Sequence, residues 1–505
     1  MEWSTLKKDE LVNLAEQQSE KIAVLEQQLR LLLSKTYGTS SEKVSADQLA
    51  LFESEISADD IAKTDEDNIT VTYQRKRRGK RKVCDKNLER QRIEYTLDKV
   101  ERLCDCGAEL TKIGEQKSEQ YDMVPARYIV IEHVQHKYAC SCCKSKESIK
   151  TAVKPPQILP KTNAAAGLLS YITTAKYVDS TPLNRQEKQH ERGGLYLPRN
   201  TMSRWLIQLA DAVLPLINLF DDEIRAGPYT QCDETTIQVL KETNRKASSK
   251  SYIWVRHGGL PGKESVLYNY YPSRSSEVVV ALFEGCHGYV QCDGYAAYNV
   301  LEKQGITLVG CMAHARRKFN DALQSLSSKE AVQKSKAATA LTFFKKLYAI
   351  EKEGKVLSPE ERYALRQEKS IPLLNTFKEW LGAQVILPKS PLGVAINYTL
   401  NQWEKLIRYC DDGILEIDNN RDERAVRPVA IGRRNWLFAD TPKGAHTNAR
   451  FYSLIETCKL HGHEPYAYLK HIFKELPLAT TVEDYEALLP WCLDSETLKQ
   501  EAKIV

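Results

Sequence analysis

The first 43 residues carry apolar side chains at a spacing of three or four, which is the spacing of one helix face. The positions that define this face are Leu11, Ala15, Gln18, Ile22, Leu25, Leu29 and Leu32. Alternate steps of four and three make a heptad seam of about three heptads, in which Gln18 is the polar member. One amphipathic helix packed on its own core and a short coiled coil that pairs chains both fit this seam. We favour the coiled coil, and therefore a homo-oligomer, because the residues that follow offer no obvious apolar partner.

Residues 44–82 lack this periodicity and read as a linker that ends in a basic arm. An acidic stretch over residues 53–67 precedes a block in which seven of eight residues are cationic. The cations of this block are Arg75, Lys76, Arg77, Arg78, Lys80, Arg81 and Lys82. A run of like charges is usually solvated, and a polyanion such as DNA is its natural partner. The formal net charge of +5 does not indicate DNA binding by itself, and a merely soluble linker is the alternative.

Further along the chain, the pattern predicts helices over residues 163–222 and then a change to strands. The strands are expected at residues 229–240, 251–257, 265–271, 289–293 and 307–311. A helix follows from His314, and residues 321–410 are helical again, with Ser358 as the cap of one of these helices. The fold class is therefore multidomain α/β. It has a catalytic core over residues 225–474, a helical insertion at about 321–410 and a helical tail over 475–505.

Residues 83–155 hold a cluster of cysteines that is typical of a small metal-binding domain. Its two pairs, separated by 33 residues, are Cys104 with Cys106 and Cys140 with Cys143. Each pair can present two thiolates to one tetrahedral Zn²⁺. The single residue within the first pair is shorter than the usual spacing, and Cys142 is an alternative ligand. The chain has thirteen cysteines, an odd number that fits a reducing cytoplasm better than a disulfide framework. We predict structural zinc, with buried free thiols or redox chemistry as alternatives.

Residues 160–224 have the layout of a helix-turn-helix DNA reader. Helices are expected at residues 168–177, at 183–193 and from about 197 onward. Asn200 or Thr201 is the expected cap of the third helix, and Thr201, Ser203 and Arg204 near its start are the candidate DNA contacts. A plain helical connector fits the same pattern, and the basic arm upstream decides in favour of DNA contact.

Three acids in the strand-bearing core carry the candidate chemistry. Asp233 and Asp293 each end a segment that reads as a half-buried strand, and Glu423 opens a helix. A charge at the end of a buried strand is costly unless it is paired or bound to a metal. An RNase H-like nuclease core uses two strand-end aspartates and a helix glutamate, in this chain order, to hold Mg²⁺ (or Mn²⁺). Periodicity alone leaves Glu423 in competition with Glu416, Asp418 and Asp422.

Two sets of cations lie near these acids in the sequence. Arg316, Arg317 and Lys318 follow a strand together with His314 and could meet phosphates, although an ordinary solvated helix start is the alternative. The second set is Arg421, Arg424, Arg427, Arg433 and Arg434. From it we select Arg424, Arg433 and Arg434 as DNA contacts, while the others fit surface salt bridges.

At these residues the chain resembles the insertion-sequence 66 family of DDE transposases, over nearly its whole length. The specific blocks are Tyr37-Gly-Thr-Ser-Ser-Glu-Lys43, Tyr121-Asp-Met-Val-Pro-Ala-Arg127, Cys311-Met-Ala-His-Ala-Arg-Arg-Lys-Phe319, Asp418-Asn-Asn-Arg-Asp-Glu-Arg-Ala-Val-Arg-Pro428, Gly432-Arg-Arg-Asn-Trp-Leu-Phe438 and Tyr452-Ser-Leu-Ile-Glu-Thr457. The resemblance implies a leucine-zipper-like helix over 1–43, a zinc finger, a helical DNA-binding region and an RNase H-like core. It also implies that Glu423 is the third acid, because this position matches the family's Asn-Asn-x-x-Glu-Arg pattern.

The expected function is DNA transposition with Mg²⁺: cleavage at the ends of the element to expose 3′-hydroxyls, followed by strand transfer into target DNA. The expected partners are double-stranded DNA, as terminal repeats and as target, and small companion proteins of the element. A DNA-binding regulator with an inactive nuclease fold and a structure-selective nuclease are the alternatives. The chain has no run of 18 apolar residues, so we expect no membrane span and a place in the bacterial cytoplasm, associated with the nucleoid.

Overall fold

The structure is a computed structural model that describes residues 8–37, 128–139, 149–326 and 335–503. The chain divides into two units, Met1–Ser40 with Tyr128–Val505 on the one hand and Ser41–Arg127 on the other. All described residues belong to the first unit. The basic arm and the four predicted zinc ligands, Cys104, Cys106, Cys140 and Cys143, lie outside the described residues.

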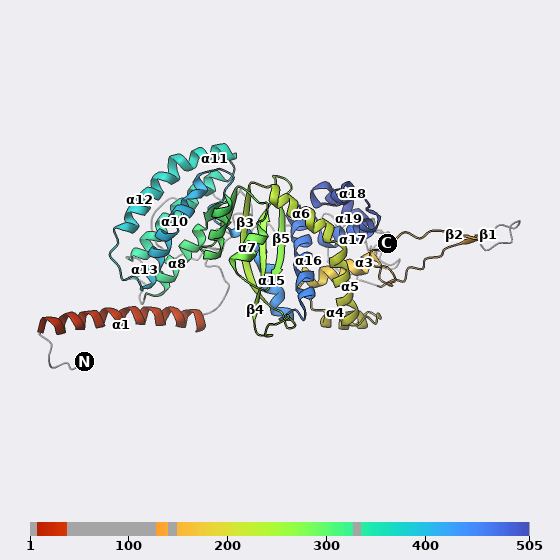
Figure 1. The fold of residues 1–505 in the computed structure, drawn as a ribbon, viewed down its shortest axis with the longest axis horizontal. Coiled ribbons are helices and arrows are strands. Elements are labelled where there is room, and N and C mark those ends of the chain that lie inside the picture. Colours follow the sequence, from red (N-terminus) through yellow and green to blue (C-terminus); the bar gives the residue numbers. More distant parts are fainter. Residues whose placement is uncertain (1–7, 38–127, 140–148, 327–334, 504–505) are drawn as a thin grey trace, which may run out of the picture. The chain divides into compact units, whose positions relative to one another are not determined.

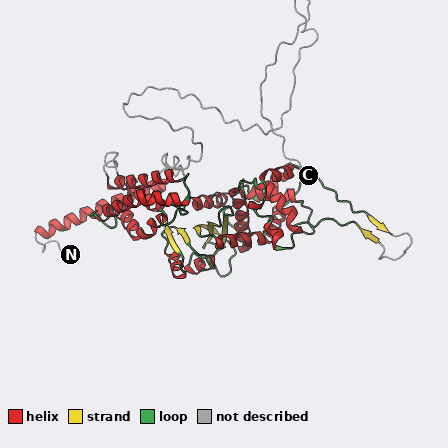
Figure 2. Ribbon diagram, turned by 90° about the horizontal axis from the view of Figure 1, so that it is seen from above, coloured by secondary structure: helices red, strands yellow, loops and turns green. Residues whose placement is uncertain are grey.

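The centre of the unit is a five-stranded mixed sheet with the strand order β5-β4-β3-β6-β7 (Figure 1). Its strands are β3 (Tyr229–Gln238), β4 (Lys250–Gly258), β5 (Ser265–Tyr271), β6 (Tyr289–Cys292) and β7 (Thr307–Gly310). β3, β4 and β5 are antiparallel neighbours, whereas β6 and β7 run parallel to β3. All five predicted strands are confirmed, because their apolar runs are buried in a sheet that has helices on both faces (Figure 2).

One face and the β5 edge of the sheet are covered by helices from two distant parts of the chain. These helices are α3 (Ala166–Tyr177), α5 (Arg199–Ala212), α6 (Leu214–Ala226), α16 (Pro442–Leu460) and α17 (Pro465–Glu475). They share one hydrophobic core with β4 and β5. At the edge, the amides of Val266 and Tyr268 donate to the hydroxyls of Thr457 and Ser453 of α16, at 3.0 and 2.8 Å. These side chains satisfy backbone groups that an edge strand otherwise exposes.

The opposite face packs against α7 (Ser276–Leu282) and the 3₁₀ helix η4 (Ala296–Gln304). A second apolar cluster joins these two elements to the sheet, with Trp254, Leu282 and Tyr298 among its members. Two further elements lie outside the main sheet: α4 (Leu183–Arg192), and a two-stranded antiparallel ribbon of β1 (Lys137–Ala139) and β2 (Ile149–Thr151).

The predicted helical insertion lies between β7 and α15 (Asn420–Trp436), the helix that carries Glu423. It comprises α8 (Met312–Gln324), α10 (Lys336–Gly354), α11 (Pro359–Leu365), the π-helical turn η5 (Arg366–Ser370), α12 (Ile371–Gly382), α13 (Pro391–Asn401), α14 (Trp403–Ile407) and η6 (Arg408–Cys410). These elements enclose a core of their own that includes Phe319, Phe344 and Phe377. The capping box predicted at Ser358 is present, with Glu361 as its partner.

The two ends of the described chain are helical, as predicted. The heptad segment forms one helix, α1 (Lys8–Tyr37), on which Ile22, Leu25, Leu29 and Leu32 are each more than half exposed. An exposed seam of this kind is what a chain-pairing helix presents before pairing, and the pairing itself stays a prediction. The tail contains η7 (Leu476–Leu478), α18 (Val482–Glu486), η8 (Pro490–Cys492) and α19 (Ser495–Lys503).

Candidate active site

The first two acids lie on neighbouring parallel strands. Asp233 is part of β3, and Asp293 is the residue directly after β6. The register pairs Gln231 with Gln291, so each aspartate comes two residues after a paired glutamine. Because parallel strands end at the same edge of a sheet, the two carboxylates reach the same edge. Glu423 comes to them from the first turn of α15, which packs against β3 and β4.

The electrostatics of Asp233 show that the three acids act on one another. Burial raises the pKa of Asp233 to about 7, and the negative charges of Glu234, Glu423 and Asp293 add to the rise. The amide of Glu234 donates to Asp233 Oδ1 at 2.8 Å, which is too little to offset these effects. Charges raise each other's pKa in this way only at short range. A divalent cation bound between the acids would remove the repulsion, and hard carboxylate oxygens are the ligands that Mg²⁺ and Mn²⁺ prefer.

Arg274 is a functional candidate that the sequence did not indicate. Its guanidinium pairs with Glu234, lies 3.9 Å from Asp293 Oδ2 and stacks over the ring of Tyr295 at 3.7 Å. Tyr298 donates to the other oxygen of Glu234 at 2.8 Å. Glu234 therefore has two structural partners, Arg274 and Tyr298, whereas its neighbour Asp233 has neither of them. The loop before α7 that supplies Arg274 has no distinctive pattern from which this contact could have been predicted.

Glu423 has two partners from the start of α8. Arg317 Nη2 lies 3.2 Å from Glu423 Oε2, and His314 Nδ1 lies 3.7 Å from Glu423 Oε1. Burial and the charge of Arg317 lower the pKa of His314, while Glu423 and Asp293 oppose this. Arg317, selected from the sequence as a phosphate contact, thus meets the third acid in the structure.

The neighbour of Glu423, Asp422, has the opposite environment. Its side chain is fully buried, and among the described residues neither of its oxygens has a hydrogen-bond partner. Burial, followed by the charges of Asp233 and Glu423, raises the pKa of Asp422 well above its usual range. Asp422 is thus buried in the first turn of α15, while the Glu423 side chain is 26% exposed. Sequence periodicity could not separate these two acids, but burial does.

The segment before α15 is held by a buried network of amides. Gln291 Nε2 donates to the carbonyls of Glu416 at 2.8 Å and Gly310 at 3.2 Å, and Gln231 Nε2 donates to the carbonyl of Asp418 at 3.1 Å. Gln231 also donates to Gln291 Oε1 at 2.9 Å. The sequence contains a signal for this network: Gln-Cys-Asp occurs in β3 and again at the end of β6, so each buried glutamine precedes its aspartate by two residues.

Two other acids near Glu423 have structural partners. Asp418 accepts a hydrogen bond from Tyr348 of α10 at 2.6 Å, and burial raises its pKa to about 6. Glu416 accepts from Gln231 at 3.2 Å and from Arg421 at 3.3 Å. Both acids thus serve to join the insertion, the strands and the start of α15.

The predicted DNA contacts have varied surroundings. Ser203 and Arg204 are exposed on α5, and Thr201 is half-buried. Arg424 and Arg434 are exposed on α15, Arg316 is half-buried, and Lys318 lies over the ring of Tyr398 at 4.6 Å. The predicted cap of the third helix was wrong: α5 begins at Arg199 after Pro198, whose fixed φ suits a helix start.

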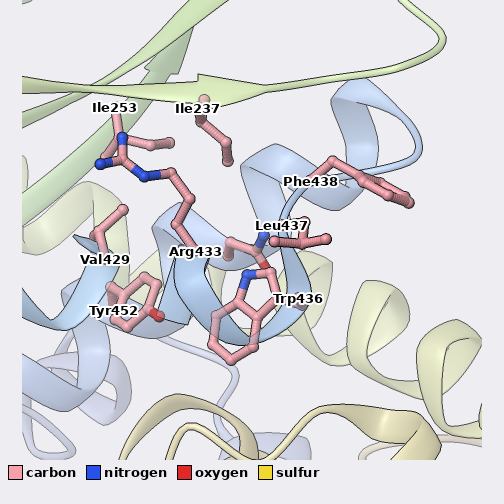
Figure 3. A pocket seen from close by; sticks show the side chains of 9 residues that line it. Ile237, Ile253, Val429, Arg433, Trp436, Leu437, Phe438 and Tyr452 are labelled. Atoms are coloured by element: carbon pink, nitrogen blue, oxygen red, sulfur yellow. The ribbon is translucent and has the colours of Figure 1, made fainter. Parts of the chain in front are cut away.

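Arg433 is the predicted contact that points away from the surface. It donates to the hydroxyl of Thr236 in β3 at 2.7 Å and to the carbonyl of the same residue. Figure 3 shows its guanidinium beside Ile253, in a small pocket that Trp436 and Leu437 also line. Arg433 joins α15 to the sheet in this arrangement.

The expectation that Asp233 ends its strand was wrong, because β3 continues to Gln238. Carboxylates from the middle of β3, from the residue after β6 and from the first turn of α15 define a candidate centre for divalent metal. Comparison with known proteins identifies the chain more closely. The model of the Transposase IS66 family matches residues 161–447, and that of the IS66 C-terminal element matches 453–491. The zinc-finger binding domain of transposase IS66 matches residues 101–144, and the model described as Transposase C of IS166 homeodomain matches 24–93. The chain therefore belongs to the IS66 transposase family.

Three relatives from Sinorhizobium fredii (strain NBRC 101917 / NGR234) are similar over most of their length. The uncharacterized protein y4qI is 31% identical over 94% of this chain and 89% of its own, and y4hP is 30% identical over 94% and 85%. The uncharacterized protein y4jD is 31% identical over 81% of this chain and 82% of its own. Family membership makes this protein a transposase in the broad sense, an enzyme class that acts on DNA. In the part of the chain that the structure describes, no helix is long and apolar enough to cross a membrane.

Proposed function

We propose that this protein is a DDE transposase whose catalytic acids are Asp233, Asp293 and Glu423. The observation that carries the proposal is the convergence of these three carboxylates from segments far apart in the chain. Burial raises the pKa of Asp233 to about 7, and the charges of Glu423 and Asp293 contribute to this rise. The strand order supports an RNase H-like core, with three antiparallel strands followed by two that run parallel to the first.

The role of the protein is to position the reacting groups and to hold charge. Asp233, Asp293 and Glu423 would hold divalent Mg²⁺ or Mn²⁺, which would supply activation of the attacking oxygen and stabilisation of the leaving oxygen. Asp233 and Asp293 offer oxygens from one sheet edge, and Glu423 offers them from the facing helix. Arg274 and Arg317 lie at the margin of this centre, where a cation can neutralise a phosphate. The expected products are 3′-hydroxyl ends, which the same centre then joins to target DNA.

DNA has a continuous path along α15 in this proposal. Arg424, Arg427 and Arg434 are all exposed on this helix, and they follow Glu423 at the spacing of one helix face. Arginines in such a row contact successive phosphates without reading bases. We assign recognition of the element's terminal repeats to the basic arm at residues 75–82 and to Ser203 and Arg204 of α5.

The remaining parts of the proposal concern assembly. Cys104, Cys106, Cys140 and Cys143 hold a structural Zn²⁺, α1 pairs two chains, and small companion proteins of the element join the complex. The complex acts on the nucleoid in the bacterial cytoplasm. The zinc-finger match over residues 101–144 and the exposed leucines of α1 support these roles.

The experiment that tests the proposal is end cleavage and strand transfer with Mg²⁺ on a plasmid that carries the gene's own flanking DNA. We expect activity from the wild type and from the surface control Glu284→Gln, whose side chain is exposed. Asp293→Asn is expected to lose at least about 1,000-fold in both steps, because it removes a ligand charge at the reacting centre. Binding of the flanking DNA should persist in all three proteins.

Three outcomes would contradict the proposal in different ways. Full activity of Asp293→Asn would remove this residue from the catalytic set. Cutting of branched DNA by the wild type, without strand transfer of specific ends, would identify a structure-selective nuclease instead. If all three proteins bind the flanking DNA but none cleaves it, even after the companion proteins are added, the result would favour a DNA-binding regulator.

A further inference from the structure

The start of α8 places two donors that are not acids beside Glu423. Cys311 precedes the helix as its capping residue, and His314 lies in the first turn. One ligand atom from each of Cys311, His314 and Glu423 lies within 4.8 Å of the other two. Sulfur, imidazole nitrogen and carboxylate oxygen therefore surround one point at the edge of the candidate active site.

The separation between His314 and Glu423 is too long for a hydrogen bond and suits a shared ion. Nδ1 of His314 lies 3.7 Å from Oε1 of Glu423, and this nitrogen is buried without a hydrogen-bond partner among the described residues. A nitrogen and an oxygen ligand of a tetrahedral ion, with bonds of about 2.0–2.2 Å, lie roughly 3.3–3.5 Å apart. The observed distance is slightly longer than that range, so a small movement of either side chain brings the two atoms into it.

Backbone hydrogen bonds hold the three donors in place. The amide of Met312 donates to the carbonyl of Ile417 at 3.1 Å, which ties the start of α8 to the segment before α15. The amide of Glu423 donates to the carbonyl of Asn419 at 3.0 Å, which begins α15 at this point. The backbone of two helix starts therefore fixes the positions from which the three side chains reach a common point.

We propose that Cys311, His314 and Glu423 form a transition-metal subsite of the active centre, which takes a borderline divalent ion such as Zn²⁺ or Co²⁺ in preference to Mg²⁺. Thiolate and imidazole ligands favour such ions, whereas Mg²⁺ requires oxygen ligands. Three protein ligands leave a fourth position of a tetrahedral ion open to water or to a phosphate oxygen. This assignment deepens the proposed function and rests on it for the role of the subsite in DNA chemistry, but not for the binding of the ion.

Binding of the metal ion changes the protonation of Cys311 and the ion pair between Arg317 and Glu423. The Cys311 thiol releases its proton to solvent as the sulfur–metal bond forms, because thiolate is the form that ligates metal. Arg317, now 3.2 Å from Glu423, no longer has to neutralise this acid, and its half-exposed guanidinium becomes available to DNA phosphate.

The test is a titration of the full-length protein, with its cysteine cluster already loaded with zinc, by Co²⁺ under absorption spectroscopy. In the wild type we expect thiolate-to-cobalt charge-transfer absorption in the near ultraviolet and visible bands of a four-coordinate ion. Cys311→Ser should lose the charge-transfer absorption. His314→Ala should weaken Co²⁺ binding by at least about 10-fold and shift the visible bands. The matched controls Cys492→Ser and His287→Ala, both at exposed positions, should behave as the wild type.

Two further variants distinguish loss of the metal subsite from unfolding of the protein and from loss of strand transfer. Glu423→Gln changes a partly exposed side chain without changing its shape, so its loss of Co²⁺ affinity cannot be attributed to unfolding. Asp293→Asn should retain the cobalt spectrum while it loses strand transfer. Unchanged cobalt spectra and affinities in Cys311→Ser, His314→Ala and Glu423→Gln would overturn the subsite. A cobalt site that depends on these residues, together with an active Asp293→Asn, would leave the subsite standing and remove Asp293 from the proposed catalytic set.

Discussion

Asp233 and Glu423 reach the candidate active site by two different kinds of support. Asp233 belongs to β3, whose backbone is paired with β4 on one side and β6 on the other. Glu423 follows an irregular segment whose carbonyls are held by the side chains of Gln231 and Gln291. A backbone ladder does not depend on which side chains it carries, whereas a side-chain network does. Substitutions remote from the acids should therefore disturb Glu423 more readily than Asp233.

The largest expected effect tests the burial and the charge repulsion that raise the pKa of Asp233 in β3. Without metal, its folded pKa of about 7 lies above the ordinary value of 3.8, so the folded state binds the proton more tightly than the unfolded state. The stabilising contribution of this group is complete below pH 3.8 and declines as pH rises through about 7. Asp233→Asn should therefore stabilise the metal-free protein by roughly 4 kcal/mol at pH 7 and by roughly 2 kcal/mol at pH 5.

Urea unfolding in buffer without added divalent metal, at pH 5 and pH 7, measures this difference. Addition of Mg²⁺ should stabilise the wild type and leave Asp233→Asn unchanged, because only the wild type keeps the ligand charge. The control is Asp440→Asn, which changes an exposed acid paired with Lys241. It should have the stability of the wild type at both pH values and should be stabilised by Mg²⁺ to the same extent. Equal stabilities of wild type and Asp233→Asn at both pH values would show that Asp233 is not in a charge-repelling site.

The second prediction concerns the hydrogen bonds of Gln291, which hold the segment before Glu423. Gln291→Leu should cost about 2–3 kcal/mol of unfolding free energy, because the carbonyls of Glu416 and Gly310 lose their buried donor. End cleavage should fall by more than 10-fold even where the variant is fully folded, since Glu423 moves with its segment. The control Gln238→Leu changes an exposed glutamine of β3 and should cost less than about 0.5 kcal/mol. Normal cleavage by folded Gln291→Leu would show that Glu423 does not depend on this network.

The same contrast explains what could be predicted from the sequence. The strands were predicted to within two residues, because alternating and continuous apolar runs reflect burial in a sheet directly. Ser358, followed by proline and two glutamates, gave the start of α11 by local chemistry alone. The position of Asp293 directly after β6 was accessible for the same reason. Asp233 was expected at a strand end but lies within β3, because the strand continues beside β4 as far as Gln238.

The rest depends on contacts between segments far apart in the chain. Neither the burial of Asp422 nor the approach of Arg274 to Glu234 leaves a local pattern, because each is decided by how α15 and the loop before α7 meet the sheet. Arg433 looked like a surface cation by composition, but the tilt of α15 on β3 brings it to Thr236. The pairing of His314 with Glu423 joins residues 109 positions apart, and no periodicity reports such a distance.

A smaller effect is expected at the contact between the insertion and this segment. Tyr348→Phe removes the hydrogen bond to Asp418, at a cost of about 1–2 kcal/mol for a partly buried bond to a charged group. The pKa of Asp418, which this bond holds down against burial, should rise further above about 6. Urea unfolding and cleavage assays at several pH values should therefore show a loss that grows above pH 6. Tyr363→Phe, at an exposed position of α11, is the control, and an equal loss in both variants would contradict a specific role for the contact.

The smallest effect separates stability of the insertion from support of Glu423. Ser358→Ala removes the cap of α11 and should cost about 1 kcal/mol. Arg366, just after this helix, is held independently by Glu351 and donates to the carbonyl of Leu415 at 2.9 Å, so fraying of α11 should not reach the segment before Glu423. Cleavage should therefore stay within about 2-fold of the wild type, as in Thr481→Ala, which removes the matching capping box of α18 in the tail. A cleavage defect in Ser358→Ala that Thr481→Ala does not share would mean that Glu423 depends on the whole insertion rather than on its side-chain contacts.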